Sequence, residues 1–415
     1  MEVDNKKNDE NIIPNDADKP QKGVNVPNLR FNEFTHYWNK STVRDSFILS
    51  SGTTPSRING DYFNGNICWL TSGELKKKKT STTLEKITEK ARKIFNLKLF
   101  PKGTFVIATY GLEATGVRGT CTILDTSSTI SQACMAFEPK GEIHNEFLYY
   151  WYLKYGEIIG TKYAQGTKQQ NLSFDLVEGL TVYFPSSDEQ LKICKFLDLL
   201  DQRIDTQSKI IEDLELFKKG IWNYIYLIKS NDWECVKLSN VLCERKDFAL
   251  KGDEFIHATL SKDGIFAKTN RYDRDFLVTN NEKQYKITRL NDICYNPANL
   301  KFEVICLNKF GDAIFSPIYV TYTVKNDFIP SFVELILTSS RFLKYIRKYE
   351  QGTVYERMAV NSEDFLKGEI LIPTKDKQKA IADYFDILDL KIKKEKDILE
   401  LYKKQKEYLL KNMFI

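Results

Sequence analysis

The sequence contains few of the residues that metal binding and nucleophilic catalysis require. It has only 3 histidines, isolated at positions 36, 144 and 257, and none of its 8 cysteines forms a C-x-x-C pair. Because structural zinc sites need closely spaced Cys or His ligands, the sequence predicts no metal site. Scattered cysteines in a chain of this size are typical of buried thiols in a reducing compartment, so we expect a cytoplasmic protein.

Long apolar runs are absent as well: no stretch approaches the roughly 18 residues that a membrane span requires. The first 20 residues are polar and lack the apolar core of a secretory signal, so we expect them to form a frayed tail. The length of 415 residues and the hydrophobic content of 42% are sufficient for two or three domains with their own cores.

Motifs for cofactor binding and catalysis are incomplete. The glycine-rich stretches have the wrong spacing for a P-loop or a dinucleotide fingerprint. The segment Asn296-Pro297-Ala298-Asn299 lacks the second proline and the aromatic residue of the motif with which amino-methyltransferases hold a flipped base. Asp61, Glu74 and Lys76 are the residue types of a nuclease site, but E-x-K spacing is common by chance. These gaps predict a chain without catalytic residues and without a cofactor.

One segment occurs twice in the chain. FPSSDEQLKICKFLDLLDQRI at 184–204 aligns without a gap to IPTKDKQKAIADYFDILDLKI at 372–392, with 8 identities in 21 positions. Gln-Gly-Thr precedes each copy, so the repeat extends into the flanking globular segments and predicts the order globular, helix, globular, helix. The predicted parts are a disordered tail at 1–25, domains at 26–187 and 229–375, and helices at 188–228 and 376–415.

The two globular segments are rich in β-branched and aromatic residues. TFVIATYG at 104–111 and DAIFSPIYVTYTV at 312–324 are typical of strands, and short helices are expected at 145–159 and 330–348. The predicted fold class is therefore α+β. We expect two β-rich domains separated by two long antiparallel helices, which form a coiled-coil spacer with pseudo-two-fold symmetry.

Both helical segments carry a heptad pattern, which breaks at equivalent places: Lys218 with Lys406, and Gln207 with Glu395. A helix of about 38 residues, roughly 57 Å long, cannot bury such a seam alone, so the other copy is the expected partner. A generic helical hairpin or a homodimeric coiled coil is the alternative. The residues predicted to pack in this seam are Ile193, Leu197, Leu200, Ile204, Ile211, Leu214, Ile381, Phe385, Leu388, Ile392, Leu399 and Leu409.

Charged residues in the seam predict its register. If the two copies pair about a pseudo-two-fold axis, Lys218 faces Asp386 and Lys406 faces Asp198. Polar seam residues fix the register of other coiled coils. We therefore predict that these four residues are register contacts.

Positive charge is greatest in the first globular segment. Residues 34–187 contain 18 Lys and Arg against 13 Asp and Glu, whereas residues 229–375 contain 22 against 20. The densest cluster is Lys76–Lys79, which is suited to phosphate contact, although an ordinary solvated loop explains it equally well.

Polar and aromatic loops are better candidates for contacting bases. Gln and Asn can pair bidentately with adenine, and Arg or Lys with guanine, in the major groove. For each such residue an ordinary surface loop or turn is the alternative. The predicted DNA-binding residues are Lys76, Lys77, Lys78, Lys79, Tyr110, Arg118, Lys168, Gln169, Gln170, Asn171, Arg271, Arg274, Asn296 and Arg357.

Over almost its whole length after the N-terminal tail, the chain resembles the DNA-specificity subunits of type I restriction–modification systems. The most specific match is the Pro–Gln–Leu-Asp–Ile pattern of the repeat, followed by Lys218-Lys219-Gly220. The second copy departs from it, with Lys377 in place of Glu189. Further similar segments are VPNLRFNEFTHYW (26–38), SGTTPSRINGDYFNGNICWLTSGEL (51–75), YNPAN (295–299) and SPIYVTY (316–322).

This resemblance implies a non-catalytic subunit with two target-recognition domains, each recognising one half of a split, asymmetric site in double-stranded DNA. The helices would act as a ruler between them. The implied partners are two modification (methyltransferase) subunits, which bind S-adenosylmethionine and methylate adenine N6, with restriction/translocase subunits joining for cleavage. A protein-interaction scaffold without DNA binding is one alternative, and a stand-alone enzyme is another.

Overall fold

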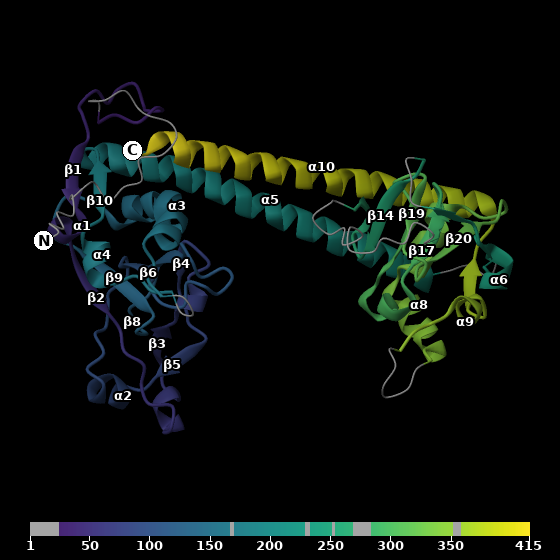
Figure 1. Cartoon of the computed structure of the whole chain (residues 1–415), viewed down its shortest axis with the longest axis horizontal. Coiled ribbons are helices and arrows are strands. Elements are labelled where there is room, and N and C mark those ends of the chain that lie inside the picture. The colour runs from purple at the N-terminus through teal and green to yellow at the C-terminus, as the bar shows by residue number, and fades with distance from the viewer. Residues whose placement is uncertain (1–24, 167–169, 229–232, 251–253, 269–283, 352–357) are drawn as a thin grey trace, which may run out of the picture. The chain divides into compact units, whose positions relative to one another are not determined.

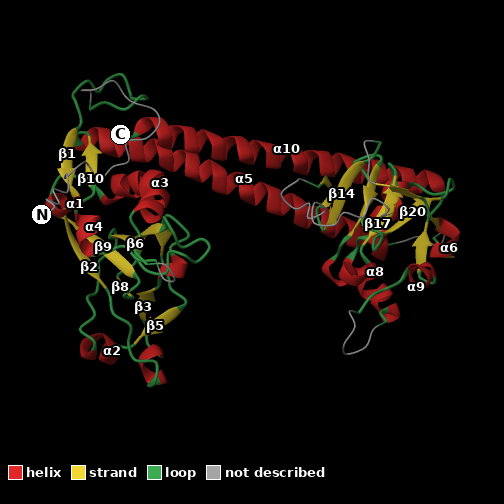
Figure 2. Cartoon of the chain, in the orientation of Figure 1, coloured by secondary structure: helices red, strands yellow, loops and turns green. Residues whose placement is uncertain are grey.

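The structure is a computed structural model that describes residues 25–166, 170–228, 233–250, 254–268, 284–351 and 358–415 (Figure 1). It divides into two compact units, residues 1–208 with 398–415 and residues 209–397. Each unit contains a β-rich body and half of each of two long helices, α5 (Ser187–Leu227) and α10 (Lys375–Met413) (Figure 2). The predicted α+β fold with two β-rich regions and two long helices is confirmed.

The body of the first unit contains three β-sheets. The five-stranded sheet has the order β2-β9-β6-β7-β4, the three-stranded sheet has the order β5-β3-β8, and β1 pairs with β10. The elements are β1 (Asn39–Thr42), α1 (Val43–Ser46), β2 (Phe47–Ser51), η1 (Gly60–Phe63), β3 (Ile67–Leu70), η2 (Ser72–Glu74), β4 (Lys79–Thr80), β5 (Glu85–Ile87), α2 (Glu89–Ile94), β6 (Phe105–Ala108), β7 (Cys121–Leu124), β8 (Ser128–Ile130), β9 (Cys134–Pro139), α3 (Asn145–Lys162), α4 (Phe174–Glu178) and β10 (Thr181–Phe184).

Helix α3 connects the five-stranded sheet of this unit to α5. Strand β6 lies in the middle of the sheet with all its residues buried, which explains its uninterrupted apolar sequence. Tyr152 of α3 packs edge-on against Phe105 of β6, with 5.9 Å between ring centroids. Tyr150, two residues earlier, donates its hydroxyl to Asp198 and Asp201 of α5 at 2.6 and 2.9 Å.

The described residues of the second body also form three sheets. Their orders are β12-β20-β17-β18, β13-β16-β19-β14-β15 and β11-β21. The elements are β11 (Glu234–Lys237), α6 (Leu238–Val241), β12 (Leu242–Glu244), β13 (Phe248–Leu250), β14 (Ile256–Ser261), β15 (Gly264–Ala267), β16 (Gln284–Thr288), β17 (Asp292–Tyr295), η4 (Pro297–Phe302), β18 (Ile305–Leu307), β19 (Ala313–Phe315), β20 (Val320–Val324), α7 (Pro330–Leu337), α8 (Ser340–Ile346), η5 (Arg347–Tyr349), α9 (Ser362–Leu366) and β21 (Glu369–Ile372).

The internal repeat is visible in how each body meets its helix. In the first unit β10, which precedes α5, pairs antiparallel with β1; in the second, β21 precedes α10 and pairs antiparallel with β11. At the start of each long helix, a buried glutamine donates its amide to the carbonyl five residues earlier. The distance is 2.9 Å from Gln190 to Pro185 and 2.9 Å from Gln378 to Pro373.

The same two glutamines also hold the first turn of a helix in each body. The side-chain carbonyl of Gln190 accepts the backbone N–H of His144, the N-cap of α3, at 2.9 Å. That of Gln378 accepts the N–H of Ile329, the N-cap of α7, at 3.0 Å. Because the first N–H groups of a helix have no partner within the helix, each glutamine supplies one. The glutamine shared by both copies therefore fixes one body to one long helix.

The long helices supply equivalent residues to the two cores. Ile193, Cys194 and Leu197 of α5 lie in or against the core of the first unit, and Ile381, Ala382 and Phe385 of α10 lie in or against that of the second. The C-terminal ends are exchanged: Met413 and Phe414 pack in the first unit, and Trp222 packs in the second. The residues predicted to pack in the seam are all buried or half-buried.

The register of the helices differs from the predicted one. In the second unit Lys218 forms an ion pair with Asp389, and in the first unit Lys406 lies 2.5 Å from Asp201. Both pairs are displaced by three residues from the predicted contacts with Asp386 and Asp198. The reason in the first unit is that Asp198 is already engaged: it pairs with Lys78 of the body and accepts the hydroxyl of Tyr150. Sequence periodicity could not reveal these contacts with the body.

Candidate nucleic-acid interface

In the first unit, the described residues 164–166 and 170–172 lie next to the loop 108–120. Tyr110 and Gln165 each form a β-bridge with Asn171. The N–H of Gly111 donates to the side-chain oxygen of Asn171 at 3.4 Å, and the N–H of Leu112 donates to a backbone carbonyl of residues 170–172 at 3.0 Å. The ring of Tyr110 is exposed beside this junction. The structure therefore brings together Tyr110, Gln170, Asn171 and Arg118.

Arg118 joins the loops together rather than pointing freely outward. Its guanidinium donates to the side-chain oxygen of Gln170 at 2.5 Å and lies 3.7 Å from Glu157. Its side chain passes so close to Gly160 that a Cβ at that position would lie 2.5 Å from it. The N–H of Gln170 donates to Glu113 at 2.8 Å, and this bond lowers the pKa of Glu113. The bond between Arg118 and Gln170 uses the side-chain oxygen of Gln170, which is therefore less available to accept a hydrogen bond from a base.

The four consecutive lysines have different environments. Lys76 and Lys77 are exposed. Lys78 is turned inward, where it pairs with Asp198 and lies 4.6 Å from the ring centre of Tyr150. Lys79 lies 4.0 Å from Glu146. The prediction of DNA contact therefore suits Lys76 and Lys77, whereas Lys78 has a structural role in attaching the body to α5.

Lys76 and Lys77 belong to a strongly basic part of the first unit. We call residues 52–102 the basic lobe; it contains β3, β4, β5 and α2. It holds 11 Lys and Arg against 4 Asp and Glu, a net charge of +7 in a chain whose total is +5. Several of these cations form ion pairs. Among the described residues, no carboxylate lies within 4.0 Å of the amines of Lys76, Lys77, Lys86 and Lys90.

The basic lobe has its own small core and a fixed outer loop. Trp69 and Ile87 are buried in that core. Arg57 donates two hydrogen bonds to Glu85, both at 2.8 Å, and its guanidinium lies 4.9 Å from the ring centre of Phe63. The hydrogen bonds between these two side chains raise the pKa of Arg57 and lower that of Glu85. These contacts give the cations of the lobe a defined scaffold.

In the second unit, Asn296 does not have the environment of a base-contacting residue. It is 7% exposed, and its side-chain oxygen accepts the N–H of Ala298 at 3.1 Å as the N-cap of η4. The sequence Asn-Pro-Ala-Asn is thus explained by helix capping followed by a proline in the first turn. Five further predicted residues lie outside the described part of the chain: Lys168, Gln169, Arg271, Arg274 and Arg357.

The environments of Glu74 and Cys134 do not favour catalysis. Glu74, part of the possible nuclease set, accepts the N–H of Thr71 at 3.0 Å and that of Leu84 at 2.7 Å. Burial raises the pKa of the Cys134 thiol to about 12, which keeps it protonated. Across the described ranges, no three His, Cys, Asp or Glu side chains form a group suited to a metal ion. Within the same ranges, no helix combines the length and apolar character needed to cross a membrane.

Lys86 and Lys90 are not among the DNA-binding residues predicted from the sequence. Both are exposed, on β5 and α2, and no run of basic residues marks them. The sequence did contain a signal, because the net charge of residues 52–102 alone is +7. The wider range 34–187 has a net charge of only +5, since its other residues carry a net negative charge.

Comparison with known proteins agrees with this architecture. Residues 36–216 match the family model of the type I restriction modification DNA specificity domain. The crystal structure of a type I restriction–modification S subunit from M. genitalium aligns with a TM-score of 0.56 and 15% identity, covering 94% of this chain and 99% of that one. A chain from a structural study of type I R-M system assembly aligns with a TM-score of 0.55 and 11% identity, covering 90% and 96%. The fold is thus that of a type I specificity subunit.

Sequence relatives point to the same class. The MjaIX type I specificity subunit of Methanocaldococcus jannaschii is 30% identical over 197 residues, which is 44% of this chain and 43% of that protein. The MjaVIII specificity subunit of the same organism is 24% identical over 315 residues, 69% of this chain and 72% of that protein. The chain is thus similar to type I restriction–modification specificity subunits, and the match to the first relative spans less than half of that relative's length.

Proposed function

We propose that this chain is the non-catalytic subunit of a type I restriction–modification complex that recognises double-stranded DNA. The observation that carries the proposal is the basic lobe, with a net charge of +7 and four exposed lysines that lack a carboxylate partner among the described residues. Neutralising phosphates with lysines supplies most non-specific affinity for DNA and positions a protein on the duplex. Tyr110 and Asn171, at the loop junction, are candidates for contacting bases.

The repeat supports recognition of a bipartite site. In the proposal each body recognises one half-site, and α5 and α10, with 41 and 39 residues, set the unread gap between the halves. At 1.5 Å per residue these helices are about 60 Å long, which exceeds the ~34 Å of one DNA turn. Insertion of one helical turn into both helices should lengthen the gap and leave both half-sequences unchanged. Methylome sequencing of cells carrying this variant would show a changed half-sequence if the ruler hypothesis were wrong.

Salt dependence of DNA binding tests the basic lobe. Replacing Lys76, Lys77, Lys86 and Lys90 by Gln should weaken binding of a 40-base-pair duplex and reduce the salt slope by up to about 4, since each lost phosphate contact removes about one counterion. Fluorescence anisotropy between 50 and 200 mM salt measures both quantities. Lys404→Gln, on the exposed surface of α10, is the matched control and should leave the slope unchanged. An unchanged slope in the fourfold variant would remove the basis for DNA binding by this lobe.

A second apolar pattern on the long helices supports the binding of two identical partner subunits. We call it the outer seam; its apolar residues are Phe196 and Leu199 on α5 and the repeat-equivalent Tyr384 and Ile387 on α10, and the next positions at heptad spacing are the basic residues Arg203 and Lys391. These positions follow heptad spacing, yet Leu199 is 52% and Ile387 67% exposed. A heptad face left in water is suited to a helix from another protein. Two equivalent faces indicate two copies of one partner, which we propose to be the modification subunit.

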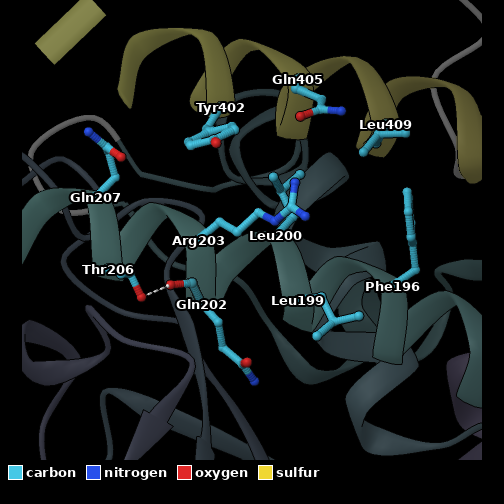
Figure 3. Close-up of a pocket in the computed structure, with 10 residues that line it drawn as sticks. All are labelled: Phe196, Leu199, Leu200, Gln202, Arg203, Thr206, Gln207, Tyr402, Gln405 and Leu409. Carbon is cyan, nitrogen blue, oxygen red and sulfur yellow. Dashed lines mark hydrogen bonds between the residues drawn. The ribbon is translucent and has the colours of Figure 1, made fainter. Parts of the chain in front are cut away.

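The outer seam borders a groove in the first unit. The groove is lined by Phe196, Leu199 and Arg203 of α5 and by Tyr402 and Leu409 of α10, which are drawn in Figure 3. The groove has a volume of about 500 Å³. Its apolar side chains and the guanidinium of Arg203 match an amphipathic helix that carries a carboxylate.

Partner stoichiometry tests this part of the proposal. Leu199→Glu and Ile387→Glu should each remove one modification subunit from the complex, and the double variant should remove both. Native mass spectrometry of the purified complex counts the subunits, and Lys404→Gln serves again as the control. Retention of two modification subunits by the double variant would show that the outer seam does not hold them. A protein scaffold without DNA binding is the competing function; it predicts intact assembly with no salt-dependent affinity for any duplex.

A further inference from the structure

The basic lobe presents two aliphatic side chains to solvent. Ile58 is 99% and Leu84 is 90% exposed, and every other large apolar side chain in the described residues is less exposed than either. Ile58 directly follows Arg57, and Leu84 directly precedes Glu85. Arg57 donates two hydrogen bonds to Glu85, both at 2.8 Å. This pair ties the two loops together, so Ile58 and Leu84 flank a single fixed contact.

Both loops are held to the lobe by further contacts. The indole N–H of Trp69 donates to the carbonyl of Thr53 at 3.1 Å, and the guanidinium of Arg57 lies 5.8 Å from the Trp69 ring centre. The N–H of Leu84 donates to Glu74 at 2.7 Å. These contacts hold the loops that carry the two aliphatic side chains. Exposing these side chains to water is unfavourable, because they are apolar.

The charged residues directly adjacent to the two aliphatic residues are engaged with each other. Arg57 and Glu85 bind each other, and the side-chain oxygen of Asn59 accepts the N–H of Asp61 at 3.1 Å at the start of η1. The surface formed by Ile58 and Leu84, which we call the apolar tip, therefore presents aliphatic groups as its most exposed side chains among the described large apolar residues. A guanine or adenine edge, which requires donors and acceptors, is a poor match for it.

We propose that Ile58 and Leu84 contact thymine C5-methyl groups in the major groove of DNA bound to the basic lobe. The inference rests on the proposed DNA binding. The thymine methyl is the apolar group that base edges display in the major groove. Lys86 directly follows Glu85 on β5, and Lys90 lies on the following helix α2, so cations able to contact phosphates adjoin the apolar tip along the chain. The positive charge of the basic lobe thus favours DNA as the ligand, and the exposed aliphatic side chains favour contact with thymine in that DNA.

Thymine-to-deoxyuridine substitution tests the inference, because it removes only the methyl group. The full wild-type chain first selects a duplex from a randomised pool, and each thymine of that duplex is then replaced singly by deoxyuridine. One or more substitutions should weaken binding about fourfold, the effect of one buried methyl group. Ile58→Ala should bind the unmodified duplex about fourfold more weakly and lose its response to deoxyuridine at one of these positions. Leu84→Ala should do the same at another position.

Matched controls come from the same lobe. Ile94 and Leu99 are exposed apolar residues away from the tip in sequence, and Ile94→Ala and Leu99→Ala should keep the wild-type profile. An identical deoxyuridine profile for Ile58→Ala and the wild type would overturn the inference, as would weaker binding at every position alike. Intact DNA binding combined with loss of modification subunits would instead assign the tip to a protein contact. Failure of the wild-type chain to select any duplex would refute the proposed function itself.

Discussion

The two halves of the chain share their attachment to the long helices and differ in their surface charge. The basic lobe, residues 52–102, has a net charge of +7, whereas the segment 195 residues further on, 247–297, contains 8 Lys and Arg against 8 Asp and Glu. This offset aligns Trp38 with Trp233, which precede β1 and β11. Yet Gln190 and Gln378 each donate to the proline carbonyl five residues earlier and accept the N–H of a helix N-cap in their own body. The two halves therefore share the contacts that attach each body to its long helix but differ in the charge of residues 52–102 and 247–297. This is expected if the two halves recognise different sequences.

A second difference lies at the position just before each glutamine. Glu189 is 1% exposed and receives two hydrogen bonds from Arg30, both at 2.7 Å. The indole N–H of Trp38 also donates to it at 3.4 Å. The equivalent residue in the second copy is Lys377, which is exposed. The segment before β1 is thus fastened to the start of α5 by a buried ion pair, which the second unit replaces with a surface lysine.

The largest effect on stability should follow from removing the buried ion pair between Arg30 and Glu189. Arg30→Ala leaves the Glu189 carboxylate buried without its partner and should lower the free energy of unfolding of the first unit by about 3 kcal/mol. Lys377→Ala should change that of the second unit by less than about 0.5 kcal/mol. Differential scanning calorimetry, in which the two units can unfold in separate transitions, measures both. In the double variant Arg30→Leu/Glu189→Leu no charge stays buried, so part of the loss should be recovered; an Arg30→Ala protein as stable as wild type would contradict this account.

An intermediate effect should follow from removing the shared glutamine in each copy. Gln190→Leu deletes three hydrogen bonds, to Pro185, Glu142 and His144, whereas Gln378→Leu deletes two. Each buried backbone group left without a partner costs on the order of 1 kcal/mol, so losses of about 3 and 2 kcal/mol are expected. Amide hydrogen exchange at His144 and at Ile329 should accelerate only in the matching variant. Exposed Gln202→Leu is the control, and equal exchange at both amides in either variant would show that the two attachments are not independent.

The sequence was sufficient to predict the fold class because the repeat and the heptads are local, periodic signals. Leu197 and Phe385 pack where the pattern places them. The register could not be predicted from these patterns, because it depends on which residues of the body each aspartate contacts. Asp198 and Asp201 are three residues apart on one helix face, and the ion pair of Asp198 with Lys78, 120 residues earlier in the chain, decides which of them is left for Lys406.

The candidate site was predictable in part for the same reason. A cluster such as Lys76–Lys79 is visible in the sequence, but whether a lysine faces solvent or an aspartate of α5 is decided by tertiary packing. Asn296 was predicted to contact DNA but caps η4 in the structure, because a side chain suited to contact adenine is equally suited to cap a helix. The exposed tip at Ile58 had no sequence signal at all, since an isoleucine in a loop is ordinary until its solvent exposure is known.

The smallest expected effects concern the two register pairs, which are equivalent in sequence but differ in burial. The side chains of Lys406 and Asp201 are 21% and 22% exposed, whereas those of Lys218 and Asp389 are 28% and 40% exposed. Coupling energies of about 1 kcal/mol for the first pair and about 0.5 kcal/mol for the second are therefore expected in double-mutant cycles. Urea unfolding of the Lys→Glu and Asp→Lys single and double variants measures them.

Charge exchange should rescue the two pairs to different extents. Lys218→Glu should be restored by Asp389→Lys, whereas Lys406→Glu should be only partly restored by Asp201→Lys, because Asp201 also accepts the hydroxyl of Tyr150 at 2.9 Å. In the Tyr150→Phe background this second cycle should become as complete as the first, since the competing hydrogen bond is gone. Asp386→Lys is the decisive control. If it rescued Lys218→Glu better than Asp389→Lys does, the helices would pair three residues away from the register described above, and the equivalence of the two pairs would be lost.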